Sequence, residues 1–176
     1  AKRTYEKAKS EGRKTSLVEQ QRANLFTTSV ANIAPGEEVV VEVEYLEDIR
    51  YEKGQFSLRF PMTLTPRYTA RTSDAAKITP PQVTSSKGHR ITINAEIDAG
   101  MPLEIIASRY HPIKVGDNKR RYTVTLGLEE VAMDHDFELV WRPVPSATPR
   151  AMLFRENIGD TPHFLLMIMP PDQDKV

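Results

Sequence analysis

Short segments in which apolar and polar residues alternate constrain the fold of this chain more than any other feature of its sequence. In the first of them, Val39, Val41 and Val43 share one face of an extended chain, and Glu42 and Glu44 share the other. The apolar faces are Val39, Val41, Val43 and Tyr45; Phe56, Leu58 and Phe60; Ile91, Ile93, Ala95 and Ile97; Tyr122, Val124, Leu126 and Leu128; and Phe137, Leu139 and Trp141. A period of two is typical of a strand with one buried face. We therefore expect each apolar face to lie in a core.

Residues that favour turns separate the alternating segments. They are Pro35-Gly36, Lys53-Gly54, Gly116-Asp117-Asn118 and Met133-Asp134. Several short strands joined by turns are typical of an antiparallel β-sandwich or a flattened barrel. Strands do not alternate with helices along the sequence, which disfavours a doubly wound nucleotide-binding sheet. The sequence thus predicts a mainly β fold, an antiparallel β-sandwich or flattened barrel, with one N-terminal helix.

That helix is expected within residues 1–21. Tyr5, Ala8 and Gly12 lie at helical spacing, Lys and Glu dominate the other faces, and Gly12 weakens or ends the first segment. A helix with such a narrow apolar stripe should lie on the surface of a sheet or of a crossover connection rather than in a core.

The last ordered segment is expected at residues 163–169. It is a continuous apolar run that ends at Pro170-Pro171. Such a run predicts a strand that is buried on both faces.

Two polar stretches interrupt the strands, at residues 69–88 and 142–149. The first is rich in Ser, Thr and Pro and predicts a long loop. The second contains three prolines, so we expect an extended surface connection rather than an interior strand. Composition does not change across either stretch, and the sequence therefore predicts one domain with two long loops.

Charge and composition exclude several kinds of partner. Lys plus Arg and Asp plus Glu number 24 each, so no net field favours nucleic acid, and the basic run at residues 119–121 is expected to be a solvated strand end. The chain has no cysteine and therefore neither a disulfide nor a thiolate metal site. Its apolar runs are far shorter than the roughly 20 residues that span a bilayer. We expect no nucleic-acid partner and no membrane span.

Catalytic motifs are also missing from the sequence. Asp134-His135-Asp136 is the one place where a histidine lies between carboxylates, and such a triplet could bind a metal or tune a base. The alternative is a turn with a solvated histidine. The sequence has no G-x-S-x-G motif, no phosphate-binding glycine loop and no D-x-S-x-S adhesion-site run. It therefore predicts no catalytic residue, no cofactor and no metal site.

Four groups of residues, in order along the chain, carry a resemblance to a known family. They are residues 16–33 with the Pro35-Gly36-Glu37 turn; Arg59-Phe60-Pro61 with Pro66-Arg67-Tyr68; residues 136–141; and Leu165-Leu166-Met167 with Pro170-Pro171. The sequence resembles the vault protein inter-alpha-trypsin (VIT) domain of inter-alpha-trypsin inhibitor heavy chains and their bacterial relatives. The resemblance implies a VIT-like domain over residues 1–171 that lacks its upstream strands. Residues 172–176 would then be a linker towards an absent von Willebrand type A domain.

The resemblance also implies a function. We expect a non-enzymatic, extracytoplasmic interaction module that supports the adjacent type A domain, in a bacterial protein that is secreted or held in the cell envelope. The expected partners are that type A domain, a further protein of unknown identity, and a second copy of the chain, which could pair through a sheet edge left open by the absent strands.

Arg59, Arg67 and Tyr68 are the candidate interaction surface, because arginine and tyrosine are frequent interface anchors. In the alternative, Arg59 lies on the wet face of its strand and Arg67 and Tyr68 fix a loop. Two other functions stay open. A carbohydrate- or matrix-binding sandwich would use Trp141, although its register with Phe137 predicts a core position. A metal-dependent hydrolase would use residues 134–136.

Overall fold

The computed structural model describes residues 1–22, 25–63, 88–118 and 120–171. These residues form thirteen strands and one short helix, and every strand pair is antiparallel, as the sequence predicted. They divide into two compact units, one built from Ala1–Glu47 and the other from Asp48–Thr63 with residues 88–171. The predicted loop at residues 69–88 and the predicted linker at residues 172–176 lie almost entirely outside the described residues.

The first unit packs a helix on a hairpin. Helix α1 spans Lys2–Ser10, strand β1 spans Thr15–Arg22 and strand β2 spans Leu25–Ala31. Tyr5 from the helix, Leu17 from β1 and Ala31 from β2 bury one another in a small core. The helix thus covers a sheet, as predicted.

The helix is shorter than the predicted residues 1–21. It ends at Ser10, and Gly12 follows with φ +74°, a left-handed conformation that glycine adopts at little cost. The next residues pair with β2, with Thr15 opposite Ala31 and Leu17 opposite Ser29. Helical propensity is a weak preference, and here the cross-strand pairing outweighs it.

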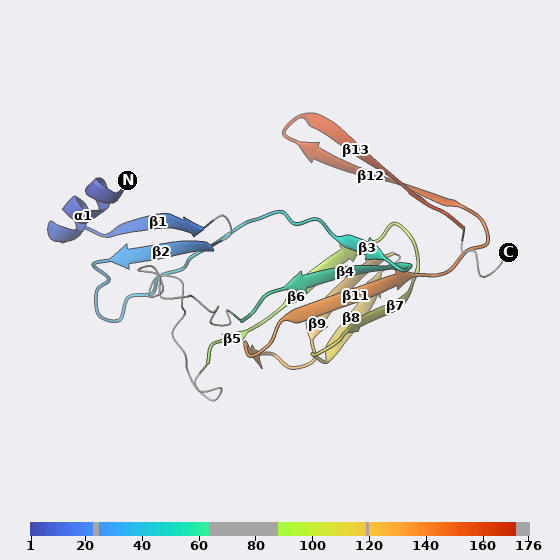
Figure 1. Ribbon diagram of the computed structural model, residues 1–176, viewed down its shortest axis with the longest axis horizontal. Coiled ribbons are helices and arrows are strands. Elements are labelled where there is room, and N and C mark those ends of the chain that lie inside the picture. The colour runs from blue at the N-terminus through green and yellow to red at the C-terminus, as the bar shows by residue number, and fades with distance from the viewer. Residues whose placement is uncertain (23–24, 64–87, 119, 172–176) are drawn as a thin grey trace. The chain divides into compact units, whose positions relative to one another are not determined.

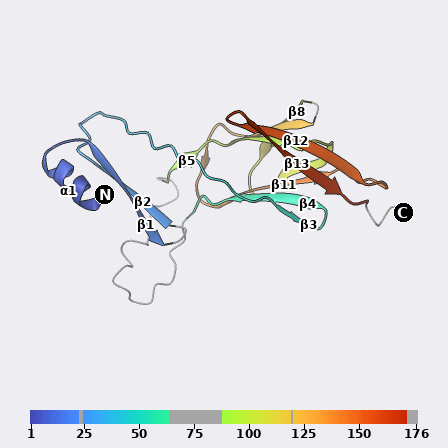
Figure 2. The same cartoon turned by 90° about the horizontal axis from the view of Figure 1, so that it is seen from above.

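The second unit contains a sandwich of two sheets that lie face to face (Figures 1 and 2). One sheet has the order β3-β4-β11-β7, from Arg50–Glu52, Gln55–Phe60, Phe137–Pro143 and Leu103–Ser108. The other has the order β6-β9-β8, from Asn94–Asp98, Arg121–Leu126 and Ile113–Asn118. Two short strands, β5 at Arg90–Ile91 and β10 at Val131–Ala132, pair beside them.

The core of the sandwich comes from the predicted alternating faces. Phe137, Leu139 and Trp141 of β11 are buried against Tyr122 and Val124 of β9. Leu126, Ile97 and the partly buried Phe56, Leu58 and Phe60 complete this core. The core predictions for β4, β9 and β11 are therefore confirmed, Trp141 included.

Three predicted details are wrong. Leu128 is exposed, because β9 ends at Leu126. Gly116, Asp117 and Asn118 belong to β8 rather than to a turn, because they pair with residues 121–123 of β9. Strand β11 continues to Pro143, which is buried, so the extended connection begins later than residue 142.

The remaining strands form a separate two-stranded hairpin. Strand β12 spans Arg150–Ile158 and β13 spans Thr161–Met169, joined by the two-residue turn Gly159-Asp160. The strand predicted at residues 163–169 is present, but its burial on both faces is wrong. Leu165, Leu166 and Ile168 are exposed, because β12 is the one strand that pairs with β13 in the described part of the chain.

Candidate interaction site

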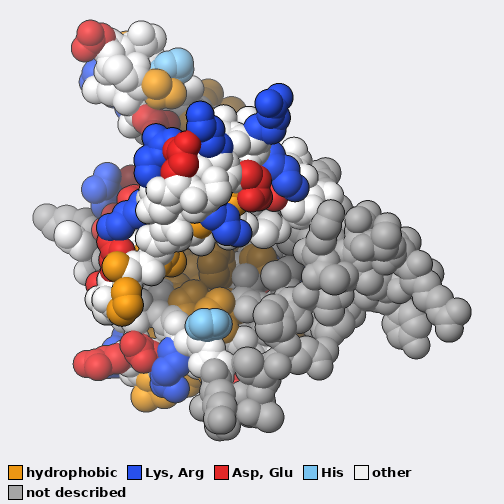
Figure 3. All heavy atoms as spheres, turned by 90° about the vertical axis from the view of Figure 1, so that its left-hand side faces the viewer, with side chains coloured by type: hydrophobic (Ala, Val, Ile, Leu, Met, Phe, Trp, Pro, Cys, Tyr) orange, Lys and Arg blue, Asp and Glu red, His pale blue; other side chains and the backbone are white. Residues whose placement is uncertain are grey.

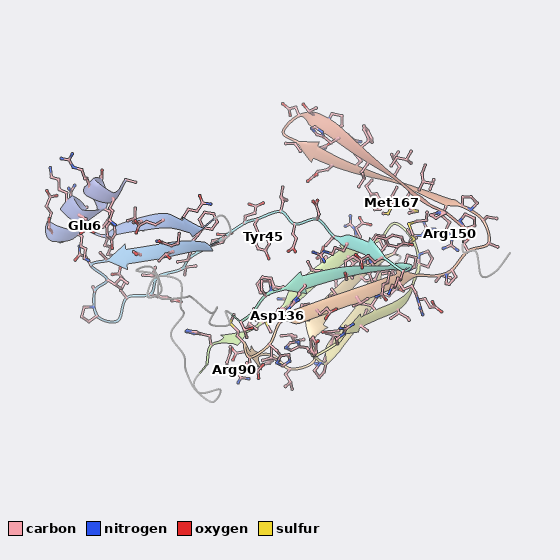
Figure 4. All side chains as sticks on the ribbon, in the orientation of Figure 1. Glu6, Tyr45, Arg90, Asp136, Arg150 and Met167 are labelled. Carbon is pink, nitrogen blue, oxygen red and sulfur yellow. The ribbon has the colours of Figure 1, made fainter. Side chains whose placement is uncertain are left out.

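Residues 38–46 are the largest departure from the predicted fold. Their alternating sequence predicts a strand with a buried valine face, but they have no regular secondary structure. No backbone hydrogen bond between described residues involves them. Val40 is 82% exposed and Val43 is 75% exposed. Figure 4 shows Tyr45 on the same segment, where the ribbon is drawn as neither helix nor strand. A strand needs a neighbour, and the described residues supply none here.

The start of this segment is anchored by Glu37. Its carboxylate accepts a hydrogen bond from the Ala34 backbone N–H at 3.0 Å and forms an ion pair with Lys14. The hydrogen bond from Lys14, followed by that from Ala34, lowers the pKa of Glu37. The Pro35-Gly36 turn is thereby closed, with Gly36 at φ +76°, and the valine-rich stretch begins from a fixed point.

A second apolar surface lies on the hairpin β12-β13. Leu153, Phe164, Leu166 and Ile168 lie on one face of it, because cross-strand partners point to the same side of a sheet. All four are about 60% exposed or more. Monomeric proteins seldom expose contiguous apolar surface of this kind, which usually marks a site of interaction.

The opposite face of the hairpin is anchored near its base. Met152 is buried, and Phe154 lies so close to Gly100 that a Cβ on this glycine would be 2.9 Å from the Phe154 ring. The hairpin therefore rests on the turn after β6 through β12.

An open groove of about 650 Å³, which the sequence did not predict, lies beside the hairpin base. Tyr51, Met101, Pro143, Val144, Met169 and Pro170 line part of it. Two arginines at its wall are engaged, since Arg142 bonds to Glu104 at 3.1 Å and Arg150 donates to the Val144 carbonyl at 3.3 Å. The groove combines residues from distant strands, so no local motif could have signalled it.

Of the predicted interaction residues, the structure describes Arg59. It lies on the exposed side of β4, and its guanidinium binds Asp136 at 2.6 Å. This contact raises the pKa of Arg59 and lowers the pKa of Asp136. Arg67 and Tyr68 lie outside the described residues, so the structure does not bring the three together.

The triplet Asp134-His135-Asp136 does not converge on one point. Asp136 is the anchor of the strand end, since it accepts the Met62 N–H at 3.2 Å besides binding Arg59. Asp134 pairs with His135 instead. Within the described residues, no group of three or more histidine and acidic side chains could hold a metal ion.

Instead, His135 stacks on His111, with ring centroids 4.5 Å apart. His111 is 6% exposed, and neither of its ring nitrogens has a hydrogen-bond partner among the residues that the structure describes. Burial, and then the proximity of His135, lower its pKa. The sequence did not predict this pair, because the two residues come from separate connections between strands.

Trp141 is 8% exposed and stacks on Phe56 inside the sandwich. It is therefore not a surface platform for a sugar ring. Figure 3 shows Lys and Arg interspersed with Asp and Glu on the face that it presents, rather than gathered in one basic patch. Among the residues that the structure describes, no helical segment has the length and hydropathy that a membrane-spanning helix requires.

Comparison with known proteins gives one match. The family model of the vault protein inter-alpha-trypsin domain matches residues 1–45, which contain the first unit's helix and hairpin and most of the exposed valine-rich segment. Neither curated proteins nor solved structures gave a match. Residues 1–45 are thus similar to a VIT domain.

Proposed function

We propose that the chain is a non-enzymatic, extracytoplasmic interaction and structural module that supports an adjacent von Willebrand type A domain. The observation that carries this proposal is the match of residues 1–45 to the VIT domain, a family that is generally non-enzymatic. The matched stretch ends in the exposed segment at residues 38–46, which supplies a surface for a partner.

Strand addition is the mode of binding that this segment fits best. A partner strand would satisfy its backbone and cover Val39, Val41 and Val43 on one face. Full burial of one such side chain contributes roughly 1.5–3 kcal/mol. Glu42 and Glu44 would lie together on the opposite face, which favours a partner strand that carries Lys or Arg there.

Two polar clusters in the described residues support the non-enzymatic part of this proposal. The Asp136 carboxylate is occupied by Arg59 and the Met62 N–H, and the buried His111 ring forms no hydrogen bond with another described residue. A general base must reach a substrate proton within hydrogen-bond distance, and neither group is placed to do so. A secreted or envelope-held bacterial protein is the setting that the family resemblance supports.

The proposal is tested by titrating the type A domain of the same polypeptide into the chain and measuring heat. We expect saturable binding that Val41→Lys weakens by about tenfold or more, because a buried interface position would receive a charge. Val18→Lys is the matched control, since Val18 is an exposed valine in the paired strand β1. Absence of binding, or equal losses in both variants, would overturn the proposal.

A further inference from the structure

The outer edge of β13 carries backbone groups that pair with no other described strand. In the described part of the chain β13 pairs with β12 alone. An unpaired edge of this length is a template for another strand. The hairpin is also the kind of element that gains most from a further strand, because an isolated two-stranded sheet is marginally stable in water.

The turn determines which residues direct their backbone groups to that edge. Gly159 has φ +61° and stands first in a two-residue loop, as in a type II′ turn, so the flanking pair Ile158 and Thr161 is hydrogen-bonded. Hydrogen-bonded and non-hydrogen-bonded pairs alternate from this pair along the hairpin. Phe164, Leu166 and Ile168 therefore direct their backbone N–H and C=O groups away from β12, towards the outer edge. Pro162 belongs to the same outward set and has no N–H to offer.

We propose that a second copy of this chain pairs with the β13 edge, antiparallel, with Leu166 opposite its own counterpart. Phe164 then lies opposite Ile168, and residues 164–168 form the shared ladder. Pro162 falls outside it, so no outward N–H is missing within the pairing. The product is one four-stranded sheet in the order β12-β13-β13-β12, and its open face joins the apolar side chains of both hairpins.

Charge favours this edge over the other exposed strand-like segment. Residues 164–168 are all apolar, so no like charges meet across the two-fold axis. Self-pairing of residues 38–46 centred on Val41 would set Glu38 against Glu44, and centring on Glu42 would set that residue against itself. Like charges directly opposite each other destabilise a pair of strands. The valine-rich segment thus suits a different partner, and β13 suits a copy of itself.

The other face of the hairpin is less available. Met152 and Phe154 of β12 contact Gly100, whereas the side chains of Phe164, Leu166 and Ile168 are exposed. A ladder of five residues is small beside the roughly 800 Å² per partner of a stable interface. We therefore expect a reversible dimer that dissociates on dilution.

Cysteine cross-linking tests the register, because the chain has no cysteine of its own. Facing residues in a hydrogen-bonded antiparallel pair have Cα atoms about 5.5 Å apart, within the range of a disulfide. Leu166→Cys should give a covalent dimer under mild oxidation. Leu153→Cys is the matched control, since Leu153 is 66% exposed against 59% for Leu166 and lies on the same face. In the paired sheet its copies would be three strand spacings, about 14 Å, apart, and it should stay monomeric.

Sedimentation over a range of concentrations supplies the second test. The wild-type mass should rise towards that of a dimer, and Leu166→Lys should weaken the dimer by at least about tenfold, because two charges would meet at its centre. Leu153→Lys should change it much less. A monomer at every concentration, equal cross-linking by both cysteine variants, or a dimer that Leu166→Lys leaves intact would each overturn the proposal. None of these results depends on binding of a type A domain.

Discussion

Single residues in this molecule show that a polar side chain can be conspicuous in the sequence and still serve the fold. Asp136 makes three contacts with the end of β4 and the residues after it, through Arg59, the Met62 N–H and the Thr63 hydroxyl. These contacts hold the pKa of Asp136 below its usual range, so they are lost as pH falls through that lowered value. The carboxylate thus adds stability at neutral pH.

His111 gives a pH dependence of the same sign, although its cause is different. Burial lowers its pKa in the folded chain below the value of about 6.5 in the unfolded one. Its contribution is therefore present above pH 6.5 and is lost as pH falls below it. The charged groups that face it are His135, which adds to the shift, and Asp134, which opposes it.

We expect the melting temperature to fall between pH 7.5 and pH 5.0, and to fall less in His111→Phe, which keeps the ring contact with Phe137 and cannot be protonated. His163→Gln is the control, because His163 is exposed on β13. The measurement is the melting temperature of each variant at pH 7.5 and at pH 5.0. Equal falls in wild type and His111→Phe would show that the buried imidazole does not carry the effect.

At the scale of elements, the hairpin β12-β13 is held to the rest of its unit by a close contact. Gly100 has φ +65° and lies under the Phe154 ring, whereas Gly159 has φ +61° and open space around it. Both positions favour glycine for their backbone conformation. They differ in whether a side chain would meet a neighbour.

This difference makes a matched pair of variants. Gly159→Ala should lower the free energy of unfolding by about 1–2 kcal/mol, because alanine is strained at a positive φ. Gly100→Ala should cost roughly 1–3 kcal/mol more, because the Phe154 ring must move. Denaturant unfolding measures both. Equal costs would mean that the hairpin does not rest on Gly100.

For the whole molecule, the sequence predicted the features that depend on a local pattern of residues, namely the strands of the sandwich and the faces that they bury. Alternation placed Val124, Leu139 and Trp141 in the core correctly, because both sheets that cover them are present. The same pattern failed at Val41, since alternation states which face a strand would bury and cannot state whether a neighbouring strand exists. The prediction for the apolar run around Leu166 was wrong in the same way, because the strand is present but its side chains are exposed.

The candidate site was predictable to a smaller extent. Arg59 was singled out, but its partner Asp136 lies 77 positions away, and no local pattern reports such a contact. The stacking of His111 on His135 was missed for the same reason. Arg67 and Tyr68 stay predictions, as does the single domain over residues 1–171.

Hydrogen–deuterium exchange of the isolated chain, read segment by segment, tests whether residues 38–46, which pair with no strand among the described residues, are open to a partner. Dilute conditions keep the hairpin dimer from contributing. We expect fast exchange over residues 39–46 and strong protection over residues 122–126 and 137–141, which lie in the paired, buried strands β9 and β11. Protection of residues 39–46 comparable to that of β9 would contradict this expectation.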